Sequence, residues 1–282
     1  MVGTVSDISR RINAERVLII AWPRAILLQL AHPLIAAGVA EHSRFRGGTK
    51  AAAFRLHQTI NAMLAISFGS DRERTAALDG IRTIHRRVRG TLPIACGPFA
   101  AGTGYTAEDP HLLLWVHVTL IESVLLGYQQ LVGPLSAAEC DQYCAESADV
   151  AVALGVGTDA VPRTWKTLRA AVERGCAAET IVVSVQAHAV ASALLAPLGG
   201  WFGRSAISPI LSLLVAGQLP TTVRSQYGFT WNSTREWRFK RIMALLRAIR
   251  RGTPRPIAWW RAARVRPIAC LAGAHGYTTA TR

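Results

Sequence analysis

Signals that begin helices recur along the chain, and they restrict its fold more than any other feature. Ser70 and Ser136 each begin a capping-box pattern, and Asp109 is an N-cap residue with a proline at the first helical position. Between these signals lie long runs with apolar residues at helical spacing, whereas the alternation typical of strands is nearly absent. The sequence therefore predicts an all-α protein.

The chain is large enough to bury a core of ordinary size. It has 282 residues, of which 50% are hydrophobic and 17% charged, and this excludes disorder, a collagen-like repeat and a disulfide-stapled miniprotein. We expect a single domain of about ten helices over residues 1–252 and a basic, loosely packed tail over residues 253–282. The longest expected loop covers residues 92–106, which are rich in glycine and small residues.

Positive charge is concentrated near the C-terminal end. Residues 221–282 hold 13 basic residues and a single acidic residue, Glu236, whereas residues 1–220 hold 19 basic and 16 acidic residues. In the tail, Trp259 and Trp260 stand among arginines, a pattern that fits a solvated tail, contact with an anionic membrane surface, or stacking on single-stranded nucleic acid. The solvated tail is favoured, membrane contact comes next, and nucleic acid is the least favoured partner.

Cysteine usage and hydropathy suggest a cytoplasmic protein. The five cysteines form an odd set without a CxxC pair, which favours a reducing compartment. Charges interrupt the apolar stretch that a signal peptide would need in the first twenty residues, so no export signal is expected. Residues 180–203 and 205–223 are uncharged and long enough to cross a membrane, but the amphipathic character of the remaining chain favours buried helices.

The segment 79-DGIRTIHRRVRG-90 carries the strongest chemical signal. We expect a helix from the cap at Ser70 to Gly90, which would place Arg82, His85 and Arg89 on one face. A haem would explain this face, because its propionates accept hydrogen bonds from arginine and its iron accepts an imidazole nitrogen. The spacing alone favours a solvated basic face, and that alternative stays open here.

Several separated motifs together resemble the catalytic domain shared by the latex-clearing rubber oxygenases and the MpaB-like oxygenases. The resemblance covers roughly residues 15–250. The motifs are 23-PRAILLQLAHPLIAAGVAEHSRF-45, the pair Arg55 and Thr59, the RxxHxxxR pattern of Arg82, His85 and Arg89, and 109-DPHLLLWVHVTL-120.

The resemblance implies an all-helical domain that encloses haem b. His85 would be the iron ligand, and Arg82 and Arg89 would be the flanking arginines of the family's haem-binding motif. Arg55 and Thr59 would lie near the haem, and Glu41 would be the acidic residue that acts as a base. These assignments predict an oxygenase.

Two departures from the family pattern narrow the expected chemistry. Gln58 stands where the rubber-cleaving branch can place a lysine, and because glutamine is a poor iron ligand, the sixth iron position should be open or hold water. The expected lack of an export signal disfavours polymeric rubber as the substrate. We therefore expect a small apolar substrate, isoprenoid or lipid-like, with dioxygen or peroxide as the oxidant.

Other interpretations remain beside this one. His117 lies in an apolar helix, where it would be either a hydrogen-bonded core histidine or a residue lining the haem pocket. A di-iron bundle is disfavoured because Glu108-x-x-His111 is the sole Glu-x-x-His spacing in the chain, and a proline interrupts it. The alternative function is a non-catalytic helical protein that binds haem or lipid and associates with a membrane through its basic tail.

Overall fold

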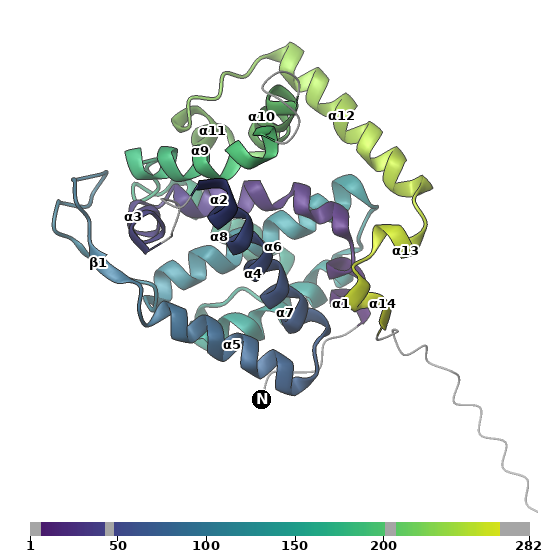
Figure 1. Cartoon of the computed structure of the whole chain (residues 1–282), viewed down its shortest axis with the longest axis horizontal. Helices are drawn as coiled ribbons and strands as arrows, with labels where there is room; N and C mark the ends of the chain where they lie inside the picture. The colour runs from purple at the N-terminus through teal and green to yellow at the C-terminus, as the bar shows by residue number, and fades with distance from the viewer. Residues whose placement is uncertain (1–6, 43–47, 201–206, 266–282) are drawn as a thin grey trace, which may run out of the picture.

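The computed structural model describes residues 7–42, 48–200 and 207–265, which form fourteen α-helices, two short 3-10 helices and one small sheet (Figure 1). The all-α prediction is confirmed. The helices are α1 (Asp7–Asn13), α2 (Trp22–Leu30), α3 (Pro33–His42), α4 (Gly48–Phe68), α5 (Asp71–His85), α6 (Pro110–Leu131), α7 (Ala137–Leu154), α8 (Trp165–Ala177), α9 (Val185–Gly200), α10 (Ile207–Gln218), α11 (Thr221–Gln226), α12 (Ser233–Gly252), α13 (Arg255–Ala258) and α14 (Arg261–Val265). The 3-10 helices are η1 (Arg16–Ile20) and η3 (Thr158–Ala160), and the strands are β1 (Arg89–Thr91) and β2 (Gly104–Thr106).

Helix α6 is the central element, and α2, α7, α8 and α12 pack around it (Figure 1). It begins as the sequence predicts, because the Asp109 carboxylate accepts a hydrogen bond from the backbone N–H of His111 at 2.8 Å and a proline occupies the first turn. Both Ser70 and Ser136 also form complete capping boxes, at the starts of α5 and α7.

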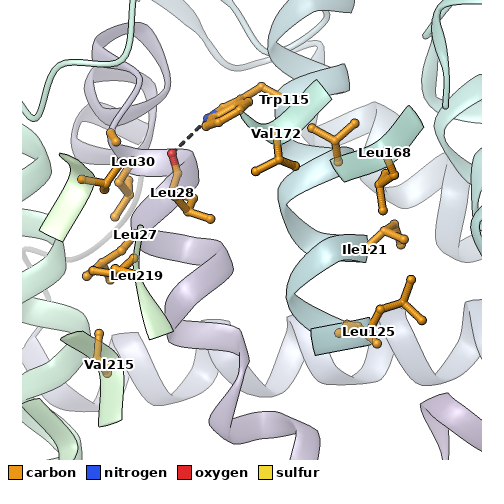
Figure 2. Close-up of a cluster of buried hydrophobic side chains, with 14 of the residues drawn as sticks. Leu27, Leu28, Leu30, Trp115, Ile121, Leu125, Leu168, Val172, Val215 and Leu219 are labelled. Carbon is orange, nitrogen blue, oxygen red and sulfur yellow. Dashed lines mark hydrogen bonds between the residues drawn. The ribbon is translucent and has the colours of Figure 1, made fainter. Parts of the chain in front are cut away.

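The main core lies between α2, α6 and α8 (Figure 2). Leu28 and Leu125 are fully buried there, and the Trp115 indole N–H donates a hydrogen bond of 2.9 Å to the Leu28 carbonyl oxygen. Apolar side chains at helical spacing on three helices fill this space, which removes a large apolar area from water.

The region predicted as a loop contains strand β2, and strand β1 lies directly before it, where the predicted helix was expected to end. Strands β1 and β2 pair antiparallel, with Arg89 opposite Thr106 and Gly90 opposite Tyr105. Helix α5 ends at His85 instead of continuing to Gly90, so the expectation that Arg89 lies on the helix is wrong. A three-residue strand is too short to give a clear alternation in the sequence, which explains why the pattern missed it.

Among the described residues, one single helix has the length and apolar character needed to cross a membrane. Helix α6 is long and apolar enough to cross a membrane, and 72% of its most apolar window is buried, which is also typical of the core helix of a soluble protein. The segment from η1 through α2 passes the same test only together with α3, and the two are bent by 108°. The two stretches predicted as candidate spans instead contain the shorter helices α9 and α10.

The first part of the predicted tail is packed against the N-terminal segment. The Trp259 indole N–H donates a hydrogen bond of 2.9 Å to Glu15, and the Trp260 backbone N–H donates one of 2.9 Å to the Ala14 carbonyl oxygen. Ala258 and Ala263 are buried. Residues 266–282 lie outside the described residues.

Candidate functional site

A cavity of about 260 Å³ lies between α3, α5, α6 and strand β2. Its walls are largely apolar, and its polar lining includes His42, His85 and Tyr105. The apolar lining residues are Leu34, Ile35, Val39, Val88, Leu112 and Leu113. Such an apolar cavity with a few polar groups is the usual form of a small-molecule site. We refer to it as the α3–α5–α6 pocket.

His85 is placed at the pocket by the end of α5. The capping box at Ser70 fixes the start of this helix, and its last residue presents an imidazole to the cavity. Burial lowers the pKa of His85 below its ordinary value, which favours the neutral ring. No hydrogen bond joins the His85 ring to another of the described residues, so a ring nitrogen is available to a ligand.

Glu41 lies beside the pocket and is held by a residue that lines it. The Tyr105 hydroxyl donates a hydrogen bond to Glu41 Oε2, and burial together with this bond raises the pKa of Tyr105. The neighbouring His42 Nε2 lies 3.0 Å from the carbonyl oxygen of Arg89. These contacts tie the end of α3 to the sheet and fix the position of one carboxylate oxygen of Glu41.

The two arginines of the RxxHxxxR pattern are turned away from the pocket lining. Arg82 Nη1 lies 2.9 Å from Asp79, and Arg82 Nη2 donates to the carbonyl oxygen of Ala153 on α7. Arg89 Nη2 donates to the Arg86 carbonyl oxygen at 2.6 Å and thereby covers the end of α5. The prediction that Arg82, His85 and Arg89 share a helix face is wrong, because α5 ends before Arg89.

The remaining predicted site residues lie away from the pocket lining or outside the description. Gln58 and Thr59 are exposed on α4. The side chain of Arg55 lies outside the described residues. His117 is buried in α6 without a hydrogen-bond partner for its Nε2 atom, and burial lowers its pKa to about 4. Two roles were expected for His117, a hydrogen-bonded core histidine or a residue lining the haem pocket. Its ring is buried in the core without a partner for Nε2, and it does not line the α3–α5–α6 pocket.

Sequence reasoning missed Tyr105 as a site residue. It lies in the segment predicted as a loop, and nothing in its local pattern distinguishes it from an ordinary loop tyrosine. The sequence also missed the buried ion pair of Arg24 and Glu122, in which Nη2 and Oε2 lie 2.7 Å apart. Here a signal exists, because each is a lone charge in an apolar helix and the two charges are opposite.

The residues present fit a haem in part. A neutral imidazole with no hydrogen-bond partner among the described residues, at the edge of an apolar cavity, is the donor that haem iron requires. The arginines expected to bind propionates instead hold backbone oxygens and exposed carboxylates. Within the described part of the chain, no group of three or more His, Cys, Asp or Glu side chains could hold a metal ion.

Comparison with protein families identifies a match over most of the chain. The family model described as "ER-bound oxygenase mpaB/B'/Rubber oxygenase, catalytic domain" matches residues 9–248. No curated protein and no solved structure is similar enough to match the chain.

Proposed function

Because the chain belongs to the family of the ER-bound oxygenases mpaB/B' and the rubber oxygenases, we propose that it is a haem-b-dependent oxygenase of a small apolar substrate. Family membership supports an oxygenase that uses an organic substrate and oxygen. The observation that carries the haem proposal is the His85 imidazole at the α3–α5–α6 pocket.

His85 would bind the haem through its neutral ring. Its lowered pKa keeps the nitrogen lone pair free at neutral pH, where a protonated ring could not ligate. When bound, the haem would supply an iron site at which dioxygen or peroxide is activated. Gln58, which stands where the resemblance can place a lysine, would give the iron no second protein ligand.

Arg82 and Arg89 would hold the carboxylate arms of the haem. Both side chains are exposed. Arg89 donates to a neutral backbone oxygen, and Arg82 divides its donors between the Ala153 carbonyl oxygen and the exposed Asp79 carboxylate. A hydrogen bond from a guanidinium to a carboxylate is stronger than one to a neutral acceptor, so an exchange of partners on binding is favourable. Arg55 and Thr59 stay assigned to the neighbourhood of the haem through the resemblance alone.

Glu41 would act as the base. Its carboxylate is exposed beside the pocket, and the Tyr105 hydroxyl holds one oxygen while the other remains for a substrate. A carboxylate so placed would accept the proton that leaves the carbon next to a double bond while dioxygen or peroxide, as the oxidant, takes up the electron pair of that C–H bond. The apolar walls of the pocket suit an isoprenoid or lipid-like molecule.

We also propose a cytoplasmic location. The four cysteines in the described part of the chain are free thiols, as expected in a reducing compartment. The predicted contact of the tail with an anionic membrane stays a prediction.

The test of haem binding compares His85→Ala with a matched histidine variant, His111→Ala, whose ring is exposed at the start of α6. After reconstitution with haemin, wild type and His111→Ala should show a Soret band with a single-imidazole spectrum, and His85→Ala should lose it. Added imidazole should restore the band in His85→Ala. Circular dichroism checks that all three proteins are folded, and an unchanged spectrum in His85→Ala would overturn the assignment.

Turnover separates the oxygenase from a non-catalytic carrier of haem or lipid. The reduced, haem-loaded protein is mixed with oxygen and a small isoprenoid alkene, and products are identified by mass spectrometry. Wild type should oxidise the alkene, whereas Glu41→Gln should keep the Soret band and lose most of the turnover, because general-base catalysis typically contributes about 10²–10⁴-fold. Recovery of unchanged alkene from wild type would favour the carrier.

A further inference from the structure

Helix α12 lies along the outer edge of the molecule (Figure 1), and three of its apolar side chains form a solvent-exposed ridge. Trp237, Leu245 and Ile249 are 55%, 59% and 57% exposed. With Arg241 they follow one another at intervals of four residues, which places them on a single row of the helix surface. Exposed apolar side chains that share one row of a helix indicate an interaction surface.

The opposite face of α12 already fixes the helix to the rest of the protein. Phe239 and Met243 are buried against α10 and α6, and Arg250 forms an ion pair with Glu15 whose Nη2 and Oε1 atoms lie 2.5 Å apart. Folding therefore uses the inward face. The outward ridge is not needed for packing within the described residues.

A basic groove adjoins the ridge. It has a volume of about 470 Å³ and lies between α10 and α12, with apolar walls from Ile210 and Leu213 and with Arg235, Arg238 and Arg241 on its α12 side. The Arg241 guanidinium lies 4.7 Å from the centroid of the Trp237 ring. Among the described residues, neither Arg238 nor Arg241 forms an ion pair with a carboxylate. We call this groove and the adjoining ridge the α12 surface.

The charge around the α12 surface is one-sided. Residues 233–265 contain ten basic residues and one acidic residue, Glu236, which pairs with Lys240 at 3.1 Å. Such a stretch is complementary to an anionic partner, and the apolar ridge requires that the partner also have an apolar phase.

We propose that the α12 surface docks on an anionic phospholipid bilayer. Trp237, Leu245 and Ile249 enter the boundary between headgroups and acyl chains, while Arg238 and Arg241 bind lipid phosphates. Leu245 and Ile249 disfavour nucleic acid, because aliphatic side chains offer no stacking platform for bases. This inference is independent of the proposed oxygenase chemistry.

The proposed membrane-contact surface lies on α12, whereas the sequence suggests the tail as the place of any membrane contact. Trp259 and Trp260 are the aromatic residues that membrane contact of the tail would use, but both contact the N-terminal segment of the protein. Trp259 donates to Glu15, and Trp260 lies under the Arg16 guanidinium at 5.5 Å. Membrane contact therefore falls on α12 and not on the tryptophan pair of the tail.

The test is co-sedimentation of the full chain with phosphatidylcholine vesicles and with vesicles of equal phosphatidylcholine and phosphatidylserine. Wild type should bind the mixed vesicles and bind pure phosphatidylcholine weakly, with binding that falls as salt rises. Arg238→Gln/Arg241→Gln should weaken binding about tenfold or more, since each basic residue near an anionic surface contributes several-fold. Trp237→Ala/Leu245→Ala/Ile249→Ala should lower it by a comparable factor.

Control variants remove the same charge, or exposed apolar side chains, at positions away from α12. Lys166→Gln/Arg174→Gln on α8 changes the net charge equally, and Ile94→Ala/Val185→Ala removes other exposed apolar side chains, so both should bind like wild type. Equal weakening in these controls would overturn the assignment to α12. Binding to a single-stranded oligonucleotide without binding to mixed vesicles would also overturn it, as would vesicle binding that appears only after removal of residues 266–282.

Discussion

Two polar clusters of this protein differ in how completely their groups are paired. The central cluster joins Arg24 of α2 to Glu122 and Ser123 of α6 and to the Gln218 carbonyl oxygen of α10. Arg24 donates to Gln218 at 2.9 Å, to Ser123 at 2.7 Å and to Glu122 at 2.7 Å, and the two charged side chains are about 5% exposed. All three guanidinium nitrogens of Arg24 have a hydrogen-bond partner.

The pocket-rim cluster, Glu41, His42, Arg89 and Tyr105, is only partly paired. Tyr105 donates to one oxygen of Glu41, and the rest of the carboxylate is exposed beside the α3–α5–α6 pocket. A closed cluster fixes three helices relative to one another, whereas an open cluster keeps an acceptor for a ligand. The difference indicates that the central cluster serves stability, and it agrees with the catalytic role proposed for Glu41 in the rim cluster.

The largest change in the free energy of unfolding is expected when the central cluster is broken. Glu122→Leu leaves the Arg24 charge buried without its carboxylate, so we expect the free energy of unfolding to fall by about 3–5 kcal/mol in urea titration. The double variant Arg24→Met/Glu122→Leu removes both charges and should recover most of this loss. A loss below about 1 kcal/mol for Glu122→Leu, a value typical of exposed pairs, would contradict the closed-cluster interpretation.

A smaller effect on stability is expected from His117, which lies on α6, the helix that also carries Glu122. Burial lowers its pKa in the folded protein to about 4, while the unfolded value is near 6.5. The folded state therefore disfavours protonation, and its stabilising contribution is present above pH 6.5 and is lost as the pH falls toward 4. We expect a slope of up to about 1.4 kcal/mol per pH unit from this residue.

Urea titrations between pH 7 and pH 4.5 measure that slope. His117→Gln should have a shallower dependence than wild type, whatever its stability at pH 7, because glutamine does not titrate. His32→Gln should behave similarly, since burial also lowers the pKa of His32 to about 4. An unchanged slope in His117→Gln would show that the buried ring is not the source.

The sequence predicted the features that depend on local pattern. Helical spacing and capping residues predicted the all-α class, and the starts of α5, α6 and α7 are confirmed at Ser70, Asp109 and Ser136. The end of α5 was mispredicted because Val88 and Arg89 continue the helical spacing, whereas pairing with β2 stabilises an extended chain there. Tertiary pairing overrode a local preference.

The site was predicted only in part, because local pattern again places some residues and not others. The prediction put His85 on the helix that begins at Ser70, and His85 is the last residue of that helix and lines the pocket. The contact of Tyr105 with Glu41 joins residues 64 positions apart, and no local pattern encodes such a pair. The lone charges of Arg24 and Glu122 could have revealed their pairing, because a charge in an apolar helix needs a partner.

The smallest effect is expected from a substitution in strand β1 that disturbs the rim cluster. A Cβ atom on Gly90 would lie 2.5 Å from the Tyr105 hydroxyl oxygen and 2.9 Å from Glu41 Oε2, so Gly90→Ala must displace one of these side chains. Tyr105 is 7% exposed and packs with Leu34 and Leu92, which limits how far its ring can move. We expect a loss of about 1–3 kcal/mol in unfolding free energy and a loss of the hydrogen bond to Glu41.

Gly104→Ala on the opposing strand is the matched control, because no atom lies within 4 Å of a Cβ atom built there. Alanine costs less backbone entropy than glycine in a strand, so this variant should be unchanged or more stable by up to about 1 kcal/mol. If Glu41 acts as the base, turnover at saturating haem should fall in Gly90→Ala and not in Gly104→Ala, with the Soret band unchanged in both. Equal turnover in the two variants would mean that the contact between Tyr105 and Glu41 holds the sheet to α3 and has no part in catalysis.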